Sequence, residues 1–247
     1  MNRSHTRIDL ADGTADMDVF HPDGPGPWPA VIFYMDGIGV RDELREMAAR
    51  FASHGYFVVL PDLFYRSQPF EPFSAATAFS NEAERARLMP ILMRVTNELA
   101  TKDTAKLIEW LDAQKSVKQG AIGCVGYCLG GRITLAVAGA FPDRIAAGAS
   151  IHGGRMATTA PDSAHLGASK IRAQMYFAVA AVDPSMPPED RARLGEALGT
   201  AGVSYIMDLV TASHGFAVPG TPVYDRAASE KHFERTTKLF ADALGGK

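Results

Sequence analysis

The sequence is poor in cysteine, in long apolar runs and in charge of one sign. Only two cysteines, Cys124 and Cys128, occur among 247 residues, so a disulfide framework does not hold this fold. No apolar run approaches the roughly 18 residues that span a bilayer, and the N-terminal segment lacks the apolar core of a secretory signal. Lys and Arg number 25 against 28 Asp and Glu, a net charge of −3 without a long like-charged block, which argues against a nucleic-acid groove. We therefore expect a cytoplasmic protein that binds neither membrane nor nucleic acid.

What the sequence does contain is ample apolar material for one large core. Hydrophobic residues make up 47% and charged residues 21%, as in ordinary globular proteins. Short apolar runs, such as Ala30 to Met35 and Ala121 to Val125, alternate with amphipathic segments. This alternation predicts an α/β fold, a mostly parallel central sheet with helices on both faces. The length favours a single domain over residues 1–247.

The segment YRSQPFEPFSAATAFS, residues 65–80, interrupts the alternation. It is rich in Phe and Pro, lacks periodicity and is longer than an ordinary connection, so we expect it to cover a functional site. Such a cover favours an apolar acyl or aromatic group. A helical pattern follows from Glu82 to Asn97, with Pro90 predicted as an interruption or a boundary.

The stretch GCVGYCLGGRITLAVAG, residues 123–139, carries the most specific signal. It reads as a strand, a tight turn and a helix of small residues, and its Gly-x-Cys-x-Gly turn is that of a nucleophile elbow. The flanking glycines suit a strained turn, and the N–H groups of the following helix would stabilise a thiolate at Cys128. The alternative is a buried, inert cysteine at a glycine-rich turn.

The other cysteine, Cys124, lies in the apolar strand and is predicted to pack in the core. Two cysteines four residues apart, with no further cysteine, are poor zinc spacing, and a disulfide between them would distort the elbow. A redox or metal role for the pair is therefore disfavoured. We expect neither a metal nor a cofactor.

A nucleophilic cysteine at an elbow needs a histidine base and an acid that orients it, in the chain order nucleophile, acid, histidine. His214 follows the last predicted strand at its carboxyl end, where such a base belongs. His152 ends another strand and is either the alternative base or part of the pocket. Asp183, also at a strand's carboxyl end, is the predicted acid, with Asp190 and Asp208 as alternatives.

Backbone N–H groups are expected to form an oxyanion hole, one after the nucleophile and one in the first strand-to-helix loop. These positions are Leu129 and Gly37. Asp36 ends a buried strand beside them, where a carboxylate is unfavourable unless it is paired or used. Its alternative reading is an acid that caps the loop.

These pieces together resemble the dienelactone hydrolase family, the carboxymethylenebutenolidases within the α/β-hydrolase superfamily. The matching motifs span nearly the whole chain in the family's order: YMDGIGV (34–40), GYFVVLPDLFYR (55–66), GYCLGG (126–131), Asp183 and HGF (214–216). The resemblance implies an α/β-hydrolase fold, a triad of Cys128, His214 and Asp183, a small ester or lactone substrate, and a monomer.

The resemblance also implies a carboxylate that helps to activate the nucleophile, and Asp36 stands where the founding enzymes have Glu. Those enzymes hold a substrate carboxylate with two Arg. Val218 occupies one of these positions, and Arg87 is the candidate for the other. The remaining pocket candidates are Tyr34, Tyr127, His152 and Phe216.

The sequence therefore predicts a hydrolase that cleaves an ester or lactone through a thioester acyl-enzyme. A broad carboxylesterase or thioesterase would use the same residues. A non-catalytic, ligand-binding protein of the same fold would keep the elbow but would need no aligned acid and histidine. All three triad positions are filled in order, which favours an enzyme.

Overall fold

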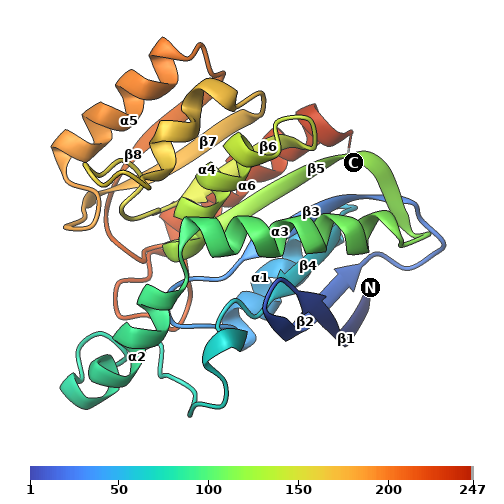
Figure 1. Ribbon diagram of the computed structural model, residues 1–247, viewed down its shortest axis with the longest axis horizontal. Coiled ribbons are helices and arrows are strands. Elements are labelled where there is room, and N and C mark those ends of the chain that lie inside the picture. Colours follow the sequence, from blue (N-terminus) through green and yellow to red (C-terminus); the bar gives the residue numbers. More distant parts are fainter. Residues whose placement is uncertain (246–247) are drawn as a thin grey trace.

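The computed structural model describes residues 1–245 and is built on one eight-stranded sheet (Figure 1). The strand order is β1-β2-β4-β3-β5-β6-β7-β8, antiparallel at β1-β2 and β2-β4 and parallel elsewhere. The strands are β1 (Asn2–Leu10), β2 (Gly13–His21), β3 (Trp28–Tyr34), β4 (Phe57–Pro61), β5 (Val117–Tyr127), β6 (Ile145–Ile151), β7 (Gln174–Val182) and β8 (Tyr205–Ser213). The predicted mostly parallel sheet is confirmed.

Helices cover both faces of this sheet, as predicted. Helices α3 and α4 pack on one face, and α1 and α6 pack on the other (Figure 1). The helices are α1 (Asp42–Ser53), α2 (Glu82–Arg94), α3 (Asn97–Asp112), α4 (Leu129–Ala140), α5 (Pro188–Thr200) and α6 (Arg226–Leu244), with short 3₁₀ helices η1 (Tyr65–Ser67) and η2 (Ala164–Lys170). None of those described has the length and apolar character that crossing a membrane requires.

Helix α2 corrects one detail of the sequence prediction. Pro90 lies inside this helix and neither interrupts nor ends it. A proline removes one helical hydrogen bond, here the one to the Ala86 carbonyl. Both Pro90 and Ala86 are exposed, so water can take the place of the missing donor. The helix ends at Arg94, three residues before the predicted end at Asn97.

The carboxyl ends of the parallel strands lie at one edge of the sheet, where the loops that follow β3, β5, β6, β7 and β8 meet. In Figure 1, α2 and the segment before it project from the body of the molecule on this side. Both chain ends lie on the other side of the picture. This topology brings residues that are far apart in the sequence to the carboxyl ends of the strands. Ligands of open α/β sheets bind at this edge.

Candidate active site

Cys128 stands between β5 and α4 in a backbone conformation that few side chains adopt. Its φ is 53°, a strained value for a residue with a Cβ atom. The turn is held because the Cys128 N–H donates to the Ile151 carbonyl at 3.0 Å, while the Cys128 carbonyl accepts from the Gly131 N–H at 3.1 Å. The thiol therefore stands at the N-terminus of α4, as the elbow motif predicts.

The glycines on either side of Cys128 are required by close approach of the backbone. A Cβ atom on Gly126 would lie 2.0 Å from the Gly130 carbonyl oxygen. One on Gly130 would lie 2.3 Å from the Tyr34 carbonyl oxygen. The Gly130 N–H also donates to the Met35 carbonyl at 3.1 Å, so the elbow is fastened to the end of β3.

His214 lies between the thiol and a buried carboxylate. Its Nε2 is 3.0 Å from Cys128 Sγ, and its Nδ1 is 2.7 Å from Asp183 Oδ2. The two alternative acids are engaged elsewhere. Asp190 pairs with Arg193, and Asp208 accepts from the Tyr176 hydroxyl at 3.3 Å. Of the candidate acids, the structure brings only Asp183 to His214.

Ser185 is a site residue that the sequence analysis missed. Its hydroxyl donates to Asp183 Oδ1 at 2.6 Å and lies 3.3 Å from His214 Nδ1, and its N–H donates to the same Asp183 oxygen at 2.8 Å. These bonds fix the carboxylate that faces the histidine. The available signal was the sequence Asp-Pro-Ser, because a serine two residues after an aspartate often bonds back to it in a turn.

The electrostatics of the site favour a protonated imidazole at His214 and an ionised carboxylate at Asp183. Burial alone would lower the pKa of His214, but the negative charge of Cys128 and the hydrogen bonds to Asp183 and Cys128 raise it well above 6.5. Burial alone would raise the pKa of Asp183, but the hydrogen bond and charge of His214, with the Ser185 bonds, lower it below 3.8. These shifts favour an imidazolium held between the sulfur of Cys128 and the carboxylate of Asp183.

The two predicted oxyanion donors are free to act. Within residues 1–245, neither the Gly37 N–H nor the Leu129 N–H donates a hydrogen bond to another group of the chain. Leu129 is the first residue of α4, so its N–H points out of the helix start. The side chains of Leu92 and Phe79 pack over Gly37, the nearest atoms lying 3.1 Å and 3.7 Å from where its Cβ would stand.

Asp36 is engaged away from the thiol. Arg41 donates to both carboxylate oxygens at 2.7 Å, and the Ile38 N–H donates to Oδ1 at 3.0 Å. Among the described residues, no hydrogen bond joins Asp36 to Cys128. The structure thus supports the reading of Asp36 as a paired loop acid, while an activating role stays a prediction.

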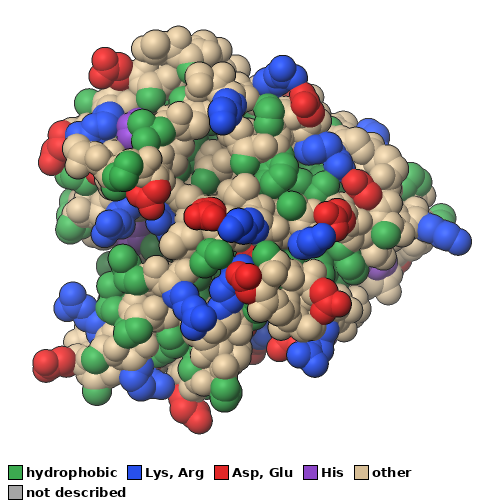
Figure 2. All heavy atoms as spheres, viewed as in Figure 1, with side chains coloured by type: hydrophobic (Ala, Val, Ile, Leu, Met, Phe, Trp, Pro, Cys, Tyr) green, Lys and Arg blue, Asp and Glu red, His purple; other side chains and the backbone are tan. Residues whose placement is uncertain are grey.

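A cavity of about 310 Å³ opens beside the thiol and is mostly apolar. Its lining residues are Asp36, Gly37, Ile38, Ala75, Ala76, Phe79, Ser80, Cys128, His152, His214, Gly215, Val218, Thr221, Pro222 and Val223. Part of the predicted cover segment therefore forms one wall. No Lys or Arg of the described chain belongs to this lining. Figure 2 shows the surface notched on its left side, with hydrophobic side chains along the lower edge of the notch.

Four of the predicted pocket residues lie outside this lining. Tyr34 is fully buried and bonds the Thr104 hydroxyl at 2.8 Å. Tyr127 stacks on Phe33 in the core, and Phe216 is fully buried. Arg87 is exposed, with its guanidinium over the Phe73 ring. The structure brings only His152 of these candidates to the cavity, with 1% of its surface exposed.

His152 belongs to a buried cluster of rings behind the site. Its ring packs edge-on against His214, with the ring centres 5.2 Å apart, and contacts Tyr127, which contacts His232. Burial lowers the pKa of His152 well below 6.5, and the charges of His214 and His232 lower it further. Burial also lowers the pKa of His232, to about 3. Within the described chain, neither imidazole has a hydrogen-bond partner. Both rings are therefore neutral at neutral pH.

The buried His232 is expected to make the fold sensitive to acid. Between pH 6.5 and 3 the unfolded chain binds a proton at this residue and the native state does not. Its contribution to the free energy of unfolding is therefore lost as pH falls, by about 1.4 kcal/mol per pH unit. The variant His232→Phe should remove this part of the slope. Urea unfolding at pH 7, 6, 5 and 4 measures it.

The matched control for this prediction is His54→Gln, because His54 lies exposed at the end of α1. This control should change the pH slope far less than His232→Phe. An unchanged slope in His232→Phe would contradict a neutral His232.

Cys124 is fully buried in β5, and neither cysteine is in a disulfide. Burial raises the pKa of the Cys124 thiol to about 12, so this thiol is inert. The prediction that Cys124 fills the core is confirmed. Within residues 1–245, no three His, Cys, Asp or Glu side chains converge as metal ligands would.

Comparison with known proteins identifies the family of this chain. The model of the dienelactone hydrolase family matches residues 16–244. A Synechocystis protein provisionally named carboxymethylenebutenolidase is 26% identical over 228 residues, which cover 90% of this chain and 89% of that protein. The carboxymethylenebutenolidase of Pseudomonas putida is 24% identical over 216 residues, 87% of this chain and 86% of that protein.

The solved structures agree on the fold. The crystal structure of a Klebsiella pneumoniae protein, provisionally described as a dienelactone hydrolase, superposes with a TM-score of 0.82 at 20% identity. The superposition covers 97% of this chain and 98% of the other. The acylaminoacyl peptidase of Pyrococcus horikoshii superposes with a TM-score of 0.69 at 16% identity, over 98% of this chain but 42% of the peptidase. The α/β-hydrolase fold expected from the sequence is thus confirmed.

Proposed function

This chain belongs to the dienelactone hydrolase family and is a carboxylic ester hydrolase, and on that premise we propose that it cleaves an ester or lactone through a triad of Cys128, His214 and Asp183. The observation that carries the proposal is the unbroken line of contacts from the carboxylate to the sulfur, 2.7 Å and 3.0 Å long. A base and an orienting acid at these distances are what a nucleophilic cysteine requires.

The first half of the reaction forms a thioester. The Cys128 thiolate attacks the carbonyl carbon, and the carbonyl oxygen, now negative, accepts hydrogen bonds from the Gly37 and Leu129 N–H groups. The bond from carbon to the leaving oxygen then breaks. The imidazolium of His214 gives its proton to that oxygen, so the alcohol or enol leaves neutral.

The second half hydrolyses the thioester. Neutral His214, oriented by Asp183, takes a proton from water while the water oxygen attacks the thioester carbon. The carbon–sulfur bond breaks, and the thiolate and imidazolium are restored. The sum is one ester and one water converted to one acid and one alcohol. Because a thiolate is itself a good leaving group, activated enol esters and lactones should react better than amides.

The thioester is the species that tests this route. The enzyme is mixed with an aryl acetate, the reaction is stopped rapidly with acid, and the digested protein is analysed by mass spectrometry. The peptide that contains Cys128 should carry one acetyl group. The other cysteine serves as an internal control, because the peptide with the buried Cys124 should stay unlabelled. Steady turnover without any acetyl group on Cys128 would exclude the thioester.

The cavity lining favours an uncharged substrate. Apart from the reacting Cys128 and His214, its one formal charge is on Asp36, which Arg41 pairs. The position of a family arginine holds the buried Val218. A substrate carboxylate would lose water without gaining a cation, a cost on the order of several kcal/mol. We therefore expect an aryl ester with a neutral acyl group to exceed its carboxylate-bearing analogue in kcat/KM by roughly 10-fold or more.

This prediction requires two esters of equal size and the same leaving phenol, so that only the charge of the acyl group differs. Their kcat/KM values, measured with the same enzyme, give the comparison. A preference for the carboxylate-bearing ester would overturn the assignment of a neutral pocket. It would leave the triad untouched, since both esters use the same bond-breaking groups.

A further inference from the structure

We infer that Arg41 is a positioning residue that holds the oxyanion loop, residues 36–40, in its working shape. This inference rests on the proposed function, because it assigns the Gly37 N–H to the oxyanion. Arg41 lines no part of the cavity beside the thiol and touches no reacting atom. It acts through Asp36 and Gly39.

The contacts form a closed clamp across the loop. Arg41 binds both oxygens of Asp36 at 2.7 Å and also donates to the Gly39 carbonyl at 3.0 Å. Within the loop, the Gly39 N–H donates to the Asp36 carbonyl at 3.3 Å. Both ends of the turn around Gly37 are therefore tied to one guanidinium, whose planar fork matches a carboxylate.

The clamp is well shielded from water. The Arg41 side chain is 13% exposed and that of Asp36 is 6% exposed. Arg41 stands at the N-cap position of α1, directly before the first helical residue and without a capping side-chain hydrogen bond. The clamp therefore joins the loop to the start of a helix that packs on the sheet. A buried, bidentate pair of this kind is costly to break, because removing one partner leaves the other charged group unpaired.

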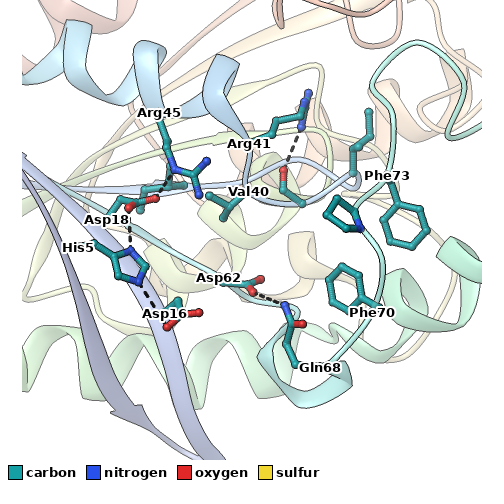
Figure 3. Close-up of a pocket in the computed structure, with 14 residues that line it drawn as sticks. His5, Asp16, Asp18, Val40, Arg41, Arg45, Asp62, Gln68, Phe70 and Phe73 are labelled. Carbon is teal, nitrogen blue, oxygen red and sulfur yellow. Dashed lines mark hydrogen bonds and ion pairs between the residues drawn. The ribbon is translucent and has the colours of Figure 1, made fainter.

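The loop lies between two cavities, so side chains do not pack against it on every side. The cavity beside the thiol is on one side, and Ile38 lines both. On the other side is a second cavity of about 290 Å³, lined in part by Gly39 and Val40 (Figure 3). Leu92 and Phe79 lie over Gly37, and the Phe64 ring lies against Gly39. The Arg41 clamp adds to this packing a polar constraint that joins Asp36 to Gly39.

The clamp also explains how a carboxylate, that of Asp36, can line the same cavity as the nucleophile without repelling it. An unpaired carboxylate in this lining would repel the charge that develops on the sulfur and on the oxyanion. The charged and titratable groups around Cys128 are His214, with Asp183 behind it, His152, Arg132 and the Asp36–Arg41 pair. Pairing with Arg41 removes the net charge of Asp36 from this set.

The test compares kcat and KM for a neutral aryl ester in four variants. Arg41→Gln should lower kcat by roughly 10- to 100-fold, with KM within about threefold. This is less than the roughly 10²- to 10³-fold loss from removing an oxyanion donor, because the Gly37 N–H is displaced and not deleted. Arg41→Lys should retain an intermediate kcat, because an ammonium cannot reproduce the bidentate contact. Asp36→Asn should lose less than Arg41→Gln, and the double variant Asp36→Asn/Arg41→Gln should fall no further than the lower single variant.

Two readouts separate positioning from simple instability. An aryl trifluoromethyl ketone, which forms an oxyanion when the thiolate adds to it, should bind Arg41→Gln more weakly by about the factor lost in kcat/KM. Alkylation by iodoacetamide uses no oxyanion hole, and in Asp36→Asn/Arg41→Gln it should label Cys128 at nearly the wild-type rate. A misfolded variant would lose binding of the ketone and would also expose the buried Cys124 to alkylation.

The matched control is Arg45→Gln. Arg45 lies on the same helix and on the wall of the second cavity, where it binds Asp18 at 2.7 Å (Figure 3), and it should keep wild-type kcat. Wild-type kcat in folded Arg41→Gln, or an equal loss in Arg45→Gln, would overturn the role of Arg41. Failure of the proposed function is distinct, because Cys128→Ala would then keep its activity.

Discussion

Replacing Cys128 by alanine is expected to lower kcat/KM for an aryl ester roughly 10⁴-fold or more, the scale of loss seen when a nucleophile is removed. Within residues 1–245, Cys128 Sγ is the one side-chain atom hydrogen-bonded to His214 Nε2, so the remaining residues can bind the ester but cannot form the acyl intermediate. Alanine keeps the Cβ atom of the strained elbow residue and removes only the sulfur. The fold should therefore survive, with a melting temperature within a few degrees of wild type.

The second cysteine provides a matched control. Cys124 lies four residues earlier, within β5, and is fully buried. Cys124→Ala deletes a sulfur atom as well, but in the core, so it should cost about 1–2 kcal/mol of stability. Its kcat/KM should stay within about threefold of wild type. Equal losses in the two variants would contradict the assignment of the nucleophile.

The second large effect is expected at Gly126, where a single methyl group should prevent the elbow from forming. An alanine Cβ there would lie 2.0 Å from the Gly130 carbonyl oxygen, 2.2 Å from its carbon and 2.7 Å from Thr134 Oγ1. Two of these atoms belong to the backbone of the α4 start, which cannot move without moving Cys128. We expect Gly126→Ala to lose more than about 4 kcal/mol in the free energy of unfolding and its activity with it.

The matched substitution is Gly199→Ala, within α5. No heavy atom lies within 4 Å of the position that its Cβ would take, and alanine favours a helix over glycine by about 1 kcal/mol. This variant should be as stable as wild type or more so, with full activity. Denaturant unfolding of the two alanine variants measures the contrast. A stable, active Gly126→Ala would show that the elbow is less tightly packed than the structure has it.

Strand ends made the centre of the site predictable. The elbow motif marked Cys128, and the carboxyl ends of predicted strands marked His214 and Asp183, because parallel strands deliver their ends to one edge. The structure brings these three side chains into contact. It also decides between Asp183 and the two other acids, a choice that the pattern alone left open.

The pocket was less predictable, because adjacency in the chain is not adjacency in space. Tyr127 precedes Cys128, but successive side chains of a strand point to opposite faces, so its ring lies in the core. Arg87 belongs to α2, and nothing in its helical pattern specified which way it points. The contacts of Arg41 and Ser185 depend on how two short loops fold, and residue types alone do not reveal a bond across such a turn.

The order of the strands in the sheet divides the site between two halves of the chain. Cys128, Asp183 and His214 all come after Val117, where β5 begins, whereas the oxyanion loop, the segment of residues 65–80 and α2 all come before Asp112, where α3 ends. On the proposed chemistry, the triad and one wall of the pocket, including Val218, come from the second half, and the opposite wall comes from the first. The two halves meet where β3 pairs with β5. Exchange of the first 112 residues between relatives would offer evolution a route to new substrates that leaves the triad intact.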